Sequence, residues 1–172
     1  MLAHFWEDVA NQDDDRFSQN ILKKLFVLNY APNSMWTYLV TVYFLQNKNQ
    51  SNQLEEKAFG SFLDKITGFI WTYAITNPGV NALRTPVYPE MVNIVNDKPV
   101  SFDGFKFDRE KVINAFNGFI FSNGRPITKS MLAWWVCQNN DQELLSLETV
   151  FEIEHIYAKS RYNNEKSLTD PK

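Results

Sequence analysis

The sequence predicts a mainly α-helical, multi-helix globular domain with a short β segment near the C-terminus. Apolar residues recur at three- and four-residue spacing through most of the chain, which is the period of an amphipathic helix. The stretch from Thr149 to Ile156 departs from that period and is rich in β-branched and aromatic residues. We therefore expect a helical domain over residues 1–145 and the start of a second unit over residues 146–172.

Composition and charge narrow the class of protein. Of the 172 residues, 44% are hydrophobic and 15% are aromatic, which is too apolar for a disordered chain. The net charge is −3, so any contact with nucleic acid must be a local patch. The single cysteine, Cys137, excludes an internal disulfide framework and is predicted to be an inert core thiol. Because the N-terminus lacks a signal-peptide pattern and no apolar run reaches ~20 residues, we expect a soluble cytoplasmic chain without membrane spans.

Helical periodicity is clearest in the first half of the chain. A helix is expected over Phe17 to Leu28, with a cap and a favourable negative charge supplied by Asp13 to Asp15. A second helix, Met35 to Gln46, follows the break at residues 32–34. The longest helix runs from about Leu54, through seven apolar residues in period, to the stop at residues 77–79.

The second half is more interrupted. Further helices are expected as two short pieces within residues 80–99, divided at the prolines of residues 86–89, then from Asp108 to about Phe119, and from Thr128 to about Asn139. Residues 100–108 alternate apolar and polar side chains around a central Asp-Gly, which fits either a small hairpin or an irregular connection.

Only two histidines are available for imidazole chemistry. His4, near the chain start with Glu7 three residues later, is assigned a structural or surface role. His155 follows Glu154 at the end of the predicted strand. Metal-assisted phosphodiester cleavage needs a neutral imidazole to take a proton from the attacking water and a divalent cation to stabilise developing charge. From the residues alone, the pair is either such a site or a polar strand edge.

A resemblance favours the catalytic interpretation. The segment Phe151–Ser160 (FEIEHIYAKS) is similar to the opening of the HNH nuclease module of ParB-like/HNH restriction proteins of the GmrSD type. In that family an N-terminal ParB-like, nucleotide-dependent domain is joined to a helical region and a C-terminal HNH nuclease. Three further segments resemble the helical region: Tyr30–Trp36 (YAPNSMW), Asn77–Arg84 (NPGVNALR) and Ser122–Trp135 (SNGRPITKSMLAWW).

The resemblance implies roles for the motif residues. It makes His155 the general base and Glu154 a ligand of a divalent metal, Mg²⁺ or Mn²⁺, in the complete nuclease module, with DNA, modified or unmodified, as the substrate. Ala158 stands where the family usually has proline, and the sequence continues for only 17 residues (172 − 155) after His155, without the later Gly-Asn-Leu segment and helix. We expect an internal fragment that lacks the ParB-like domain, requires no cofactor of its own and does not cut DNA alone.

Basic residues suggest two weaker DNA contacts. Arg125 and Lys129, followed by Trp134 and Trp135, form either a phosphate-contacting edge at a helix start or, as we prefer, a polar helix start above a buried aromatic face. Lys159 and Arg161, just past His155, are placed to steer DNA towards it.

Two hypotheses of different classes follow. The first is a fragment of a metal-dependent DNA endonuclease of the restriction and defence class. The second is a non-catalytic helical module that binds DNA or links a nucleotide-sensing domain to an effector.

Overall fold

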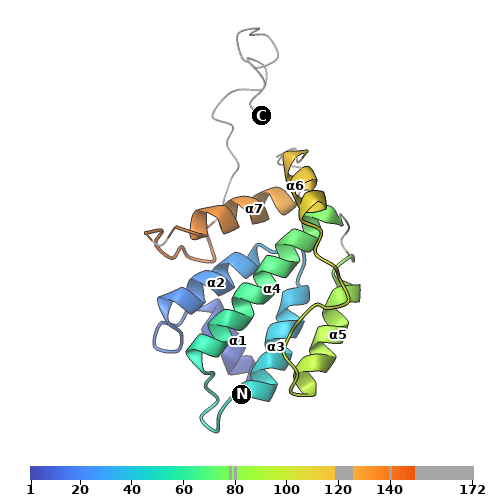
Figure 1. Ribbon diagram of the computed structural model, residues 1–172. Coiled ribbons are helices and arrows are strands. Elements are labelled where there is room, and N and C mark those ends of the chain that lie inside the picture. Colours follow the sequence, from blue (N-terminus) through green and yellow to red (C-terminus); the bar gives the residue numbers. More distant parts are fainter. Residues whose placement is uncertain (78, 80, 119–125, 140, 150–172) are drawn as a thin grey trace.

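A computed structural model describes residues 1–77, 79, 81–118, 126–139 and 141–149 of the chain (Figure 1). In these residues the chain forms seven helices and no strand: α1 Leu2–Ala10, α2 Gln19–Asn29, α3 Met35–Asn47, α4 Glu56–Thr76, α5 Arg84–Val95, α6 Arg109–Asn117 and α7 Pro126–Cys137. The prediction of a mainly helical domain is confirmed. The predicted β segment, apart from Thr149, lies outside the described residues.

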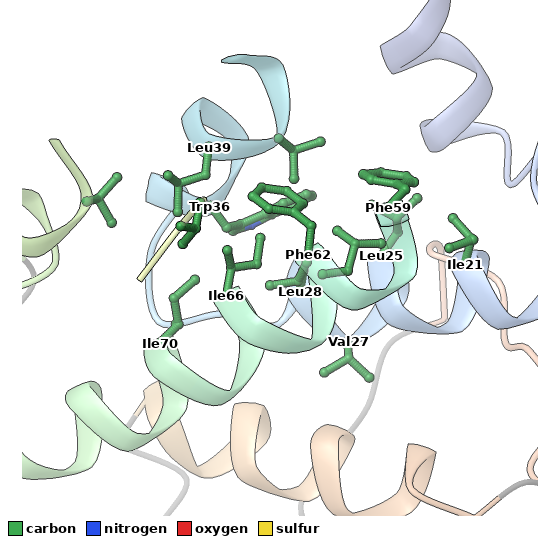
Figure 2. Packing of buried hydrophobic residues seen from close by; sticks show 14 of the residues in the cluster. Ile21, Leu25, Val27, Leu28, Trp36, Leu39, Phe59, Phe62, Ile66 and Ile70 are labelled. Carbon is green, nitrogen blue, oxygen red and sulfur yellow. The ribbon is translucent and has the colours of Figure 1, made fainter. Parts of the chain in front are cut away.

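The longest helix, α4, forms the centre of the arrangement. It packs against α2, α6 and α7, while α3 packs against α5. Figure 2 shows Phe62, Ile66 and Ile70 of α4 lying beside side chains of α2 and α3. The side chains of Leu63, Ile66, Ile70 and Trp71 are fully buried. Burying an aliphatic side chain of this size stabilises a fold by about 1.5–3 kcal/mol, so this stripe contributes strongly to the stability of the fold.

The sequence predicted N-caps for α2 and α6, and the structure corrects the first of these predictions. Ser18, not Asp13 to Asp15, is the N-cap of α2, and its side chain accepts from the Ile21 amide at 3.4 Å. Asp13 Oδ1 instead accepts from the amides of Asp15 and Arg16, because an aspartate bonds its own following backbone readily and so forms a turn before the helix. Asp108 caps α6 as predicted, accepting from the Lys111 amide at 2.9 Å.

The boundaries of the last two helices differ slightly from those expected. Helix α6 ends at Asn117, two residues before the predicted Phe119, and α7 begins at Pro126, two residues before the predicted Thr128. Proline is favoured at a first helical position because its missing amide has no intrahelical acceptor there. Helix α7 ends at Cys137, near the predicted Asn139.

Helix α1 was not predicted from the sequence. It is nine residues long and buries two of them, Phe5 and Val9, against the core. The ring of Phe5 stacks on that of Phe44 in α3, with centroids 4.2 Å apart. Leu2, Phe5, Trp6 and Val9 recur at helical spacing and contact the core, but over only about two turns, and an isolated helix of that length is marginal, so α1 depends on tertiary packing.

The expectation of two helical pieces within residues 80–99 is wrong. Helix α5 is continuous and contains Pro86 and Pro89. Pro86 is the third helical residue, where a backbone amide has no intrahelical acceptor, so it costs little. Pro89 removes one internal bond, but burial of Val87 and Ile94 on the side of the helix that packs on α3 holds the segment helical.

Residues 100–108 form an irregular connection, the second of the two forms that the sequence allowed. Glu90 of α5, only 4% exposed, organises it. The Glu90 carboxylate accepts from the amides of Ser101 and Phe102, each at 2.8 Å, and from Asn93 Nδ2 at 3.2 Å. Phe102, with a positive φ of 57°, stacks on Phe69 of α4 with centroids 3.6 Å apart. The connection is therefore fastened to both α5 and α4.

None of the described helices combines the length and apolar character needed to cross a bilayer.

Replacing Glu90 by alanine should destabilise the fold. Two buried amides would lose a charged acceptor, which costs about 2–4 kcal/mol in the free energy of unfolding. Urea unfolding followed by circular dichroism measures this difference. Glu110→Ala, which removes an exposed carboxylate from α6, is the matched control and should change stability by less than about 0.5 kcal/mol. Equal stability of Glu90→Ala and the control would contradict this account of the connection.

Candidate nucleic-acid interface

The structure describes one of the six predicted site residues, Lys129. His155, Glu154, Lys159, Arg161 and Arg125 lie outside the described residues. His4 is exposed in α1, with Nδ1 3.0 Å from Glu7 Oε2, an ordinary surface pair one helical turn apart. The described part of the candidate site therefore consists of α7 and the segment that follows it, up to Thr149.

Helix α7 is held on the core by a chain of hydrogen bonds. The indole Nε1 of Trp71 in α4 donates to the carbonyl of Ser130 at 3.0 Å, in a buried position. The hydroxyl of Ser130 in turn donates to the carbonyl of Tyr30, at the end of α2. Thr128, Ser130 and Met131 are buried, so this side of α7 faces α2 and α4.

The opposite side of α7 carries an exposed face, defined here as Lys129, Leu132, Trp135 and Val136. These residues follow one another at three- and four-residue spacing and so share one side of the helix. Trp135 is 76% exposed, which corrects the preferred expectation of a buried aromatic face. Consecutive helical residues are about 100° apart, so when Trp134 packs against the core Trp135 points away from it.

Burial also sets the protonation of two groups near α7. Desolvation raises the pKa of the half-buried Cys137 thiol, an effect that Lys23 partly opposes. A thiol with a raised pKa stays protonated at neutral pH and is a poor nucleophile, in agreement with the inert thiol expected from the sequence. Burial likewise raises the pKa of the Tyr30 phenol, which keeps its proton available for donation.

The segment after α7 is tied back to the helical body. Gln12 Nε2 donates to the carbonyl of Leu145 at 2.8 Å, and Gln12 Oε1 accepts from the amide of Leu147 at 3.1 Å. Tyr30 Oη donates to the carbonyl of Thr149 at 3.4 Å. Gln12 has a positive φ of 52°, in the turn that ends α1. These three bonds, called here the tether, fix residues 145–149 against α1 and α2.

His155 follows Thr149, the last described residue of this segment, by six residues (155 − 149).

Among the described residues, no three side chains of histidine, cysteine, aspartate or glutamate are close enough to hold an ion. The Glu154 carboxylate is a hard oxygen donor of the kind that Mg²⁺ and Mn²⁺ prefer, but one carboxylate does not complete a coordination shell.

Comparisons of this chain with family models, with curated proteins and with solved structures found no match.

Removing the side chain of Gln12 should release the tether. Gln12→Gly keeps the left-handed backbone accessible while deleting both amide bonds, worth about 0.5–1.5 kcal/mol each. We expect chymotrypsin to cleave at Leu144 to Leu147 about tenfold faster or more, with helix content unchanged. Gln50→Gly, in the exposed loop between α3 and α4, controls for the loss of a glutamine. Cleavage at the wild-type rate in Gln12→Gly would show that the tether does not hold this segment.

Proposed function

We propose that this chain is the helical region and the first part of the nuclease module of a metal-dependent DNA endonuclease. The observation that carries the proposal is the Glu154-His155 pair in a strand-like context, six residues after a segment tied to the helical body. In this proposal the helices do no chemistry. They carry the start of the nuclease module at the end of a segment that is tied to Gln12 and Tyr30.

The proposed chemistry divides between two side chains. The His155 imidazole, neutral near pH 7, takes a proton from the water that attacks phosphorus. A divalent cation bound by Glu154, when present, supplies electrostatic stabilisation for the developing charge. Further ligands from beyond residue 172 are needed to fix its geometry, so the 172-residue chain is expected to be inactive by itself.

The exposed face of α7 supplies the proposed contact with DNA. Lys129 offers a cation for a phosphate, and Trp135 offers an unburied ring six residues (135 − 129) further along α7, a little under two helical turns away. Support comes from the Ser130 hydroxyl, which holds the opposite side of α7 on the Tyr30 carbonyl, while the Tyr30 phenol binds Thr149, the residue from which the chain continues to His155.

Loss of the imidazole should abolish cleavage. In the longer protein carrying the complete module, His155→Ala is expected to lower the Mg²⁺- or Mn²⁺-dependent rate of DNA cleavage by about 10²–10⁴-fold. The measurement is nicking of plasmid DNA, modified and unmodified, followed on gels. His4→Ala, at the other histidine, is the matched control and should cleave at the wild-type rate. Cleavage by His155→Ala at the control rate would remove this residue from the mechanism.

DNA binding by the 172-residue chain should depend on the exposed face of α7. Trp135→Ala is expected to weaken binding of a fluorescent duplex about tenfold, and Lys129→Ala to reduce the slope of log K against log salt by about one. Fluorescence anisotropy over a salt series measures both. Lys57→Ala, an exposed lysine at the start of α4, is the control. An unchanged affinity and slope in both α7 variants would place DNA elsewhere.

A second candidate function is a scaffold without chemistry of its own. The exposed apolar side chains Leu132, Trp135 and Val136 favour it, because a contiguous apolar helix face is typical of a protein contact. Under this alternative the chain links a nucleotide-sensing domain to an effector, and the longer protein does not cleave DNA in the presence of either metal.

A further inference from the structure

A surface cavity of about 550 Å³ lies between α4, the 100–108 connection and the start of α6. Figure 1 shows α6 beside the C-terminal end of α4, where the yellow connection from α5 arrives. The cavity is on a different set of elements from the exposed face of α7, and no residue of the proposed nuclease chemistry lines it. Its volume is in the range of small-molecule sites, about 300–1,000 Å³.

Two glycines line this cavity, and both are exposed. A Cβ added at Gly68, in the middle of α4, or at Gly104, in the connection, would meet no atom within 4 Å. Neither glycine has a positive φ. Gly60, eight residues earlier in the same helix, differs because a Cβ there would lie 3.4 Å from Ile21 Cδ1, where α2 crosses closely.

Gly68 therefore has no role in packing or in backbone conformation within the described chain. Glycine inside a helix destabilises it relative to alanine, so Gly68 lowers the stability of α4 although neither close packing nor a positive φ requires glycine there. What the glycine does provide is empty space on the wall of the cavity. The wall at position 68 therefore leaves room for a group from another molecule.

One wall of the cavity is aromatic. The rings of Tyr73 and Phe105 meet edge to face with centroids 5.3 Å apart, and Phe69 lies 6.0 Å from Phe105. Phe69 is itself held by its stack with Phe102, whose amide is bound by Glu90. Phe107, 68% exposed at the rim, is free to stack on an incoming ring. The aromatic wall is thus already in place before any ligand arrives.

The cavity also carries cationic side chains. Lys65, Lys106 and Lys111 line it, and within the described chain none of them forms an ion pair. Two acids line it as well, Asp64, which pairs with Lys24, and Asp108, which caps α6, so the lysines outnumber the carboxylates by three to two. Three lysines without partners beside a preformed aromatic wall match a ligand that joins an anion to a planar ring.

We infer that this cavity binds a nucleotide, with its base against the aromatic wall and its phosphate near the three lysines. Aromatic side chains accept the face of any base, and lysines contact phosphate without reading sequence. The same chemistry comes from a free nucleotide or from one unit of a DNA strand. Because binding here needs neither His155 nor a metal, the inference goes beyond the proposed function and survives or fails independently of it.

Titration of the 172-residue chain with dTMP, with ATP and with a fluorescein-labelled oligothymidylate of about 12 nucleotides tests the inference. Gly68→Leu fills the cavity with a good helix former and should weaken binding about tenfold or more without lowering the melting temperature. Ser61→Leu places the same side chain on an exposed position of α4 away from the cavity and should bind as the wild type does.

The double substitution Lys106→Gln with Lys111→Gln gives a second test that adds no bulk. It should weaken binding by a similar factor, and Lys57→Gln should not. Binding of the oligonucleotide alone would identify a DNA strand as the source, and binding of dTMP or ATP a free nucleotide. Absence of binding to all three probes, or wild-type affinity in Gly68→Leu and in the double variant, would overturn the inference.

Discussion

The buried face of α4 is the constraint on which the rest of the structure depends. Its stripe of Leu63, Ile66, Ile70 and Trp71 is inaccessible to solvent, and α2, α6 and α7 all pack on this helix. Trp71 also makes a directional contact, because its buried indole N–H needs an acceptor and donates to the carbonyl of Ser130. Helix α7 is thereby fixed in rotation, with Trp135 outwards. The opposite, solvent-facing side of α4 supplies Gly68 and the wall of the cavity.

The sequence predicted a helix where it carries a long apolar period or a clear cap. Helix α4 was predicted nearly to its ends because seven apolar residues repeat in period, and α6 was predicted from its cap, Asp108, although it buries no residue. Helix α1 was missed because its apolar period covers only about two turns. Helix α5 was divided in error because proline rules describe isolated helices, whereas Pro86 falls in the first turn and packing on α3 offsets Pro89. At α7 composition predicted two buried tryptophans, but helix geometry allows only one to face the core.

The features of the candidate site also differ in whether the sequence could predict them. The Glu154-His155 pair is local in sequence, so a motif could indicate it, and it stays a prediction because both residues lie outside the described part of the chain. The tether joins Gln12 to Leu147 across 135 residues, and no local sequence pattern predicts a contact between such distant residues. The cavity likewise collects Gly68, Gly104 and Lys111 from three segments. Gly68, within the apolar period of α4, is the signal for the cavity that the sequence contains. It can be interpreted only when the residues around it in the structure are known.

Amide hydrogen exchange on the 172-residue chain, resolved by helix, tests the central claim most directly. That claim is that Trp71 and the tether make α7 and residues 145–149 part of one rigid body with α4. Protection of the buried side of α7 should come within about tenfold of that in α4, and the Leu147 amide should also be protected. Exchange of α7 and Leu147 at the rate of an unfolded peptide, beside a protected α4, would contradict it.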